Sequence, residues 1–151
     1  MTLAASYQYQ MNLEWTGQRI GELTAEGLAP LQVAPPPEFN GPGGQWTPEH
    51  LLVAATASCL MATFLAIAEI SKLAVLSFRM ESHGKLEKTP EEGYRFTEIT
   101  LMPEIGVAPE DEERARKLLE KAERNCFITK SLRATVQVEP RFVSAAAEIV
   151  H

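Results

Sequence analysis

The residues of this chain that are best suited to chemistry are its two cysteines, Cys59 and Cys126. A cysteine reacts as its thiolate, and burial in an apolar helix raises the pKa of a thiol because desolvation disfavours the charged form. Cys59 lies in such an apolar stretch, so we expect it to be inert unless the fold brings a permanent cation to its sulfur. Arg19 is the candidate cation, and Glu49 could orient its guanidinium through a bidentate pair.

The spacing between Glu49 and Cys59 limits how these groups can meet. The two residues are ten positions apart, which corresponds to about 15 Å along one straight helix at about 1.5 Å per residue. Glu49 therefore cannot reach that sulfur within one straight helix. Either the helix breaks between them, or the Arg19 and Glu49 that serve one Cys59 belong to a partner chain, which predicts a dimer.

A long apolar stretch over residues 47–70 must position the first cysteine. Thr47 can cap a helix, Pro48 suits the first helical position, and no charge occurs between Leu51 and Ala68. Its length allows a membrane span, but it is rich in Ala, Thr and Ser and has no basic flank. We therefore predict a helix of a soluble fold, buried on nearly all sides. A dimer that packs two copies of it together would supply the cover.

Composition limits the class of partner. The 151 residues carry a net charge of −6, and 45% of them are hydrophobic, which is enough for the core of a single domain spanning residues 1–151. Such an acidic chain offers no basic patch to nucleic acid or to an anionic membrane, so small molecules or proteins are the expected partners. The first residues show no secretory signal, so a cytoplasmic location is expected. The three histidines do not form a ligand set with the cysteines by spacing, and no metal site is expected.

The remaining pattern predicts an α+β domain. Alternating side chains and turn residues predict strands over residues 6–15, 19–25, 31–34, 76–88, 94–105 and 133–142. A Pro- and Gly-rich loop over residues 35–46 leads to the long helix, and a second helix starts at Pro109 and ends near Asn125 and Cys126. Residues 127–133 are expected to form a short connecting turn or helix. The tail over residues 144–151 is weakly specified. Clustered antiparallel hairpins with two helices favour α+β over a doubly wound sheet.

Two motifs in this order resemble the OsmC/Ohr family of osmotically induced and organic hydroperoxide resistance proteins. They are TPEHLLVAATASC over residues 47–59 and AERNCFITKSLR over residues 122–133. The resemblance extends from the turn with the sequence WTG, residues 15–17, to the last strand. It implies an α+β fold with antiparallel sheets around a long buried central helix and a second helix. It also implies an intertwined homodimer with two sites at the subunit interface, and neither a metal nor an organic cofactor.

The resemblance also implies roles for single residues. Cys59 matches the peroxidatic cysteine and Cys126 the resolving cysteine, while Glu49 matches the Pro-Glu site of the family. Arg19, just after the WTG turn, is the best match for the activating arginine. The chain has Phe127 where family members often have Pro directly after the second cysteine, and its approach to the long helix reads GPGGQW.

The implied reaction is the reduction of an organic hydroperoxide, with hydrogen peroxide as a further substrate. The Cys59 thiolate attacks the peroxide, and the resulting sulfenic acid condenses with Cys126 to a disulfide, which an external dithiol or lipoyl-type reductant then reduces. A position of Cys126 at the negative end of a helix would leave its thiol unactivated, which suits a resolving role. Apolar neighbours could accommodate an alkyl group or could be plain core residues: Leu60, Met61, Phe64 and Phe127.

Two other functions remain open from the sequence. One is a non-catalytic, small-molecule-binding dimer of the same fold with structural thiols. The other is a structural dimer whose cysteines only pack, since a cysteine in an apolar helix is commonly a small buried hydrophobe. Mutual reach of Cys59 and Cys126 would favour the peroxidase over both.

Overall fold

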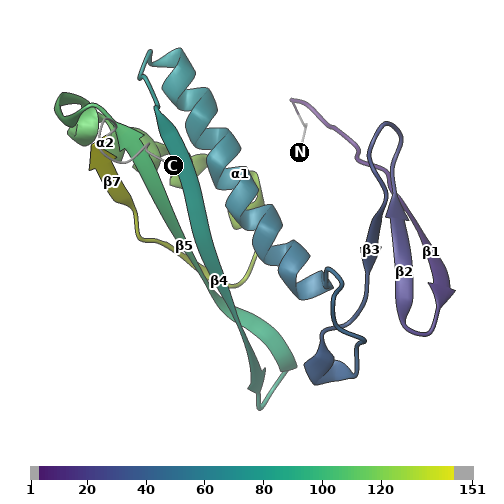
Figure 1. Ribbon diagram of the computed structural model, residues 1–151. Coiled ribbons are helices and arrows are strands. Elements are labelled where there is room, and N and C mark those ends of the chain that lie inside the picture. The colour runs from purple at the N-terminus through teal and green to yellow at the C-terminus, as the bar shows by residue number, and fades with distance from the viewer. Residues whose placement is uncertain (1–3, 145–151) are drawn as a thin grey trace. The chain divides into compact units, whose positions relative to one another are not determined.

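The computed structural model describes residues 4–144, and the chain divides into two compact units at Leu51 and Leu52. The prediction of one domain over residues 1–151 is not tested by this division. The predicted weak tail, from residue 145 on, lies outside the described residues. Figure 1 shows the elements of both units.

The N-terminal unit contains a three-stranded antiparallel sheet. Its strands are β1 (Asn12–Gly17), β2 (Ile20–Thr24) and β3 (Leu31–Val33), in the order β1-β2-β3. The first strand was expected from residue 6, but it starts at Asn12. The side chains of residues 4–16 are all exposed within the chain, so the loose alternation there does not mark a buried face.

The Pro- and Gly-rich loop returns to this sheet through its backbone. It contains a short 3-10 helix, η1 (Pro37–Phe39), and then pairs with the end of β3 through a bond from the Ala34 N–H to the Trp46 carbonyl of 2.9 Å. Gly41 is required in this loop, because a Cβ there would lie 1.6 Å from the Pro35 carbonyl oxygen. The loop thus delivers the chain to the long helix along a defined path.

The C-terminal unit contains a mixed sheet. β4 (Ser77–Thr89) and β5 (Gly93–Val107) form a long antiparallel hairpin, while β6 (Thr135–Val138) and β7 (Arg141–Ser144) both pair parallel to β5. The predicted antiparallel hairpin is confirmed, whereas the single final strand expected over residues 133–142 is two strands, and both pair parallel to β5. The helices after β5 carry the chain back before it pairs, which makes the pairing parallel, and Pro140, which lacks an N–H, lies between the last two strands.

The long helix α1 (Pro48–Ile70) buries one stripe of side chains, at the four-residue spacing of a helix face: Thr56, Leu60, Phe64 and Ala68. In the C-terminal unit this stripe packs on β5 and on α2 (Glu112–Asn125), which follows the short 3-10 helix η2 (Pro109–Asp111). Gly84 in β4 permits the close approach, because a Cβ there would lie 2.5 Å from Val53 Cγ2. Figure 1 shows α1 running along β4 and β5.

The other faces of α1 are not covered within the chain. Met61 and Leu65 are each 37% exposed and Ile70 is 83% exposed. Within the single chain β5 and α2 cover only one stripe, so the predicted burial on nearly all sides depends on a partner chain and stays a prediction. By length and composition, α1 is the one helix among residues 4–144 that could cross a membrane, a test that the core helix of a soluble protein also passes.

Candidate active site

Cys59 lies on α1, on a part of the helix that is half-buried. Its sulfur is 4.0 Å from the hydroxyl of Thr63, one helical turn further on. An unbroken helix joins this turn to the helix start, where the Thr47 hydroxyl accepts a 3.0 Å bond from the His50 N–H and so confirms the predicted cap. The local sequence therefore places Cys59 on a rigid element, at the edge of the buried stripe.

Cys126 is fully buried at the junction of two helices. It follows the last residue of α2, as predicted, but it also directly precedes a four-residue helix, α3 (Phe127–Lys130). The expectation that Cys126 sees only the negative end of a helix is therefore incomplete. The helix that begins behind it presents backbone N–H groups, which have no partners within the first turn of a helix.

The surroundings of Cys59 favour its thiolate. Burial raises the pKa of the Cys59 thiol, but the backbone N–H of Ile128, the Cys126 thiol, the Thr63 hydroxyl and the backbone N–H of Phe127 lower it. The net effect holds the pKa of Cys59 below the ordinary 9.0. An apolar helix alone was expected to leave this thiol inert. The start of α3 provides stabilising donors that sequence reasoning missed, because four residues carry too weak a pattern to predict a helix end facing α1.

The two thiols therefore meet, as the peroxidase hypothesis requires. Cys126 is one of the groups that act on the Cys59 sulfur. Of the four apolar neighbours, Leu60 and Phe64 are core residues, whereas Met61 is partly exposed and Phe127 is 75% exposed. Two of these side chains are therefore core residues, and the other two are open to solvent in the chain, where a substrate could contact them.

Arg19 lies in the N-terminal unit, just after the turn between β1 and β2. Its Nη1 donates a 3.0 Å hydrogen bond to the carbonyl of Phe39. It also lines a groove of about 440 Å³ with mainly apolar walls, to which Leu13, Trp15 and Val33 contribute. This unit therefore places a guanidinium at the side of an apolar groove.

Glu49 lies in the first turn of α1. One of its carboxylate oxygens, Oε1, is buried without a hydrogen-bond partner in the described part of the chain, and no ion pair with Arg19 forms there. Because α1 continues without a break from Pro48 to Ile70, the alternative in which a broken helix brings Glu49 to Cys59 is excluded. Service of Cys59 by the Arg19 and Glu49 of a partner chain stays a prediction.

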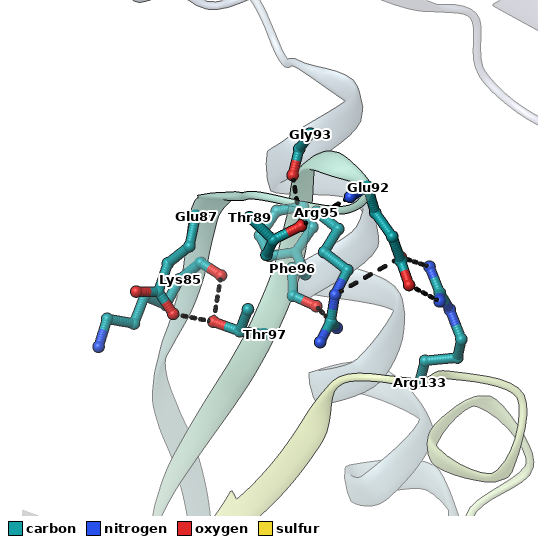
Figure 2. A network of polar contacts seen from close by, with 9 residues as sticks. All are labelled: Lys85, Glu87, Thr89, Glu92, Gly93, Arg95, Phe96, Thr97 and Arg133. Carbon is teal, nitrogen blue, oxygen red and sulfur yellow. Dashed lines mark hydrogen bonds and ion pairs between the residues drawn. The ribbon is translucent and has the colours of Figure 1, made fainter.

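A second set of residues that sequence reasoning missed lies on the turn between β4 and β5. There Glu92 forms a bidentate pair with Arg133, from the segment after α3, and a longer contact with Arg95 (Figure 2). No local sequence pattern indicates this pair, because 41 positions separate the two residues. Among residues 4–144, no group of three or more His, Cys, Asp or Glu side chains could hold a metal ion.

The comparisons with known proteins agree on one family. Residues 41–141 match the family described as OsmC-like protein. YmaD, an uncharacterized protein of Bacillus subtilis, is 27% identical over 141 residues, covering 89% of this chain and 93% of its own.

Two solved structures extend the match over most of the chain. An OsmC-like protein of unknown function from Vibrio cholerae superposes with a TM-score of 0.82 at 22% identity, over 89% of this chain and 99% of its own. An organic hydroperoxide resistance protein OsmC from Legionella pneumophila superposes with a TM-score of 0.71 at 28% identity, over 91% and 98%. These matches confirm the predicted α+β fold and the resemblance of the two cysteine motifs.

Proposed function

The chain belongs to the family of OsmC-like proteins, and we propose that it is a cysteine-based peroxidase that reduces organic hydroperoxides. The observation that carries this proposal is the thiol pair. The Cys59 thiol has a lowered pKa, and the Cys126 thiol is one of the groups that lower it. The Legionella relative is described as an organic hydroperoxide resistance protein, which supports the same chemistry.

The proposed reaction has two steps on the protein. The Cys59 thiolate attacks the distal oxygen of the hydroperoxide, so that an S–O bond forms and the O–O bond breaks. The alkoxide leaves and takes up a proton as an alcohol, and Cys59 becomes a sulfenic acid. The Cys126 sulfur then attacks the Cys59 sulfur, an S–S bond forms, and water leaves. An external dithiol or lipoyl-type reductant returns both thiols.

The geometry suits these two roles. Main-chain N–H groups at the start of α3 stabilise the attacking thiolate, and such donors need no rearrangement during the attack. Cys126 is fully buried, which shields it from peroxide until Cys59 has been oxidised. Phe127, whose N–H acts on the Cys59 thiol and whose side chain is exposed, favours a hydroperoxide with an apolar body over hydrogen peroxide.

We further propose that the active form is a homodimer in which Arg19 and Glu49 of one subunit serve Cys59 of the other. Three observations support this: within residues 4–144, one face of α1 is uncovered and Glu49 Oε1 has no hydrogen-bond partner, and the helix between Glu49 and Cys59 is unbroken. A buried carboxylate is costly unless a cation pairs with it. In the proposed dimer, Glu49 would pair with Arg19, and Arg19 would stabilise the charge that develops on the peroxide oxygens.

Intact mass spectrometry tests the peroxidase directly. The reduced protein is treated with one equivalent of cumene hydroperoxide, with the Cys59→Ser and Cys126→Ser variants alongside. We expect the wild type to lose two hydrogens as the disulfide forms, and the Cys126→Ser variant to gain one oxygen instead. An unchanged wild-type mass after minutes would contradict the proposal.

A second candidate function is binding of an apolar anion without turnover. The observation that favours it is the apolar groove beside Arg19 in the N-terminal unit. Calorimetric titration with a medium-chain carboxylate, on the wild type and on Arg19→Ala, would test it. Binding that requires Arg19, together with thiols that stay reduced in peroxide, would favour this function over the peroxidase.

A further inference from the structure

The segment that follows α3 is held by a polar contact to a distant part of its sheet. Arg133 donates through Nη1 to Glu92 Oε1 at 3.0 Å, and its Nη2 lies 2.8 Å from Oε2. Figure 2 shows Glu92 between Arg133 and Arg95. Arg95 lies on the hairpin itself, and its Nε is 3.7 Å from Glu92 Oε2. Planar, two-point pairing of this kind fixes direction as well as distance.

The turn that carries Glu92 is itself held in shape. The Thr89 hydroxyl donates to the Gly93 carbonyl and accepts from the Glu92 N–H, each at 3.1 Å. Figure 2 shows these bonds beside the Glu92 side chain. The carboxylate therefore extends from a defined turn at the end of the long hairpin, which makes it a fixed attachment point for Arg133.

The helix next to this attachment, α3, is held before its start by the buried Cys126 and after its end by Leu132, which packs against the core. α3 has only four residues, none of them fully buried, and a helix so short is not stable by itself. Its first two residues, Phe127 and Ile128, nevertheless carry the N–H groups that act on the Cys59 sulfur. Arg133 lies three residues after the last residue of α3, so a restraint on Arg133 is a restraint on this helix.

We propose that Glu92 and Arg133 are positioning residues for the thiol chemistry. Their ion pair holds α3 so that the N–H groups of Phe127 and Ile128 stay on the Cys59 sulfur and Cys126 stays within its reach. This role rests on the proposed peroxidase function for its biological meaning. Its physical content, the placement of α3 at the Cys59 thiol, can be measured without peroxide.

Alkylation of Cys59 by iodoacetamide as a function of pH provides that measurement. It is done in a Cys126→Ser background, which removes the other titratable group that acts on the Cys59 thiol in the described residues. We expect Arg133→Gln and Glu92→Gln each to move the alkylation midpoint to higher pH. Each should also slow alkylation at neutral pH about threefold, the size expected for one exposed ion pair.

Two further variants separate positioning from general stability. The double variant Glu92→Arg with Arg133→Glu restores opposite charges and should recover most of the alkylation rate. Arg95→Gln removes the other arginine contact of Glu92 without touching the segment after α3, so it should alkylate like the parent protein. Thermal unfolding of each variant provides the control, and we expect the fold to be kept because none of the three side chains is buried.

A second readout follows disulfide formation with the native cysteines. Diamide oxidises two thiols to a disulfide by accepting two hydrogens, so it needs no hydroperoxide. We expect Arg133→Gln to slow formation of the Cys59–Cys126 disulfide by diamide, and Arg95→Gln not to. Folded Arg133→Gln and Glu92→Gln proteins with the parent alkylation profile would overturn the proposal, as would failure of the charge-swapped pair to recover. A wild type that ignores hydroperoxides but shows these shifts would contradict only the peroxidase.

Discussion

The two units of the chain differ in whether their reactive side chains find partners within the unit. In the C-terminal unit, Cys59 receives main-chain N–H groups from Ile128 and Phe127 and meets the thiol of Cys126. In the N-terminal unit, Glu49 keeps a buried carboxylate oxygen that has no hydrogen-bond partner in the described part of the chain. Arg19, in the same unit, donates to a backbone carbonyl instead of to that carboxylate.

This difference separates two parts of the proposed chemistry. The thiolate is stabilised by backbone groups, which depend on the fold of α3 and not on any one side chain. The assisting charges are side chains. One of them, Glu49, has a buried carboxylate oxygen with no hydrogen-bond partner among the described residues, and leaving such an oxygen unpaired is costly. We therefore expect the Cys59 thiol to react with peroxide by itself, and to react faster when Arg19 and Glu49 reach it.

The largest expected effect comes from the attacking thiol. Cys59→Ala should reduce cumene hydroperoxide consumption to the level without protein, because no other described thiol is exposed enough to replace it. Cys126→Ser should still consume one equivalent of hydroperoxide, measured by loss of peroxide in a single turnover. If Cys59→Ala and Cys126→Ser lost hydroperoxide consumption equally in that first turnover, the two thiols could not have the different roles assigned to them.

The next effect tests whether the charges act across a dimer. Arg19→Ala should lower the rate of Cys59 oxidation by about 100-fold, as for other groups that stabilise developing charge. Subunits carrying Arg19→Ala are then mixed with subunits carrying Cys59→Ser and allowed to exchange. If sites are shared, the mixed dimer contains one complete site and activity returns. A mixture as inactive as its components would contradict shared sites.

A third prediction concerns the packing that holds Cys59 in place. Gly84→Ala inserts a Cβ 2.5 Å from Val53 Cγ2 and 2.8 Å from the Phe96 ring, so α1 or β4 must shift. We expect a loss of about 1–3 kcal/mol in the free energy of unfolding, measured by urea denaturation. Ser82→Ala on the same strand is the matched control. It removes a buried hydroxyl that has no partner in the described residues, and it should be neutral or stabilising.

The smallest expected effect is the pH dependence of the ion pair between Glu92 and Arg133. The bonds from Arg133 hold the pKa of Glu92 below its ordinary 4.5. The ionised pair therefore contributes stability above pH 4.5, and this contribution is lost as the pH falls through the lowered pKa. The difference in melting temperature between wild type and Glu92→Gln should shrink as the pH is lowered from about 7 to about 3. A difference that grows instead would contradict the pairing.

The sequence predicted the parts of the molecule that have a strong local pattern. Thr47 and Pro48 marked the start of α1, and the two cysteine motifs identified the family and the thiol pair. It predicted a short connecting turn or helix over residues 127–133, but not that the first N–H groups of α3 act on Cys59, because four residues contain no full period. It did not predict the parallel pairing of β6 and β7 either, since strand direction depends on the path of the helices before them.

The candidate site was predicted in part. The residue types of Cys59 and Cys126 were sufficient to propose redox chemistry, and the structure brings them together. The expected source of activation was a side chain, Arg19, whereas the donors that act on Cys59 within the chain are backbone groups. Backbone donors leave no signature in a sequence, because every residue except proline has an N–H.

The pKa of Cys59 in the Cys126→Ser protein tests most directly whether the C-terminal unit activates its own thiol. It can be followed by the ultraviolet absorbance of the thiolate as a function of pH, with the double variant Cys59→Ser/Cys126→Ser as the blank. We expect a midpoint below 9.0, because the Ile128 and Phe127 N–H groups and the Thr63 hydroxyl remain in place. A midpoint at or above 9.0 would show that burial prevails, and that the C-terminal unit does not activate its own thiol.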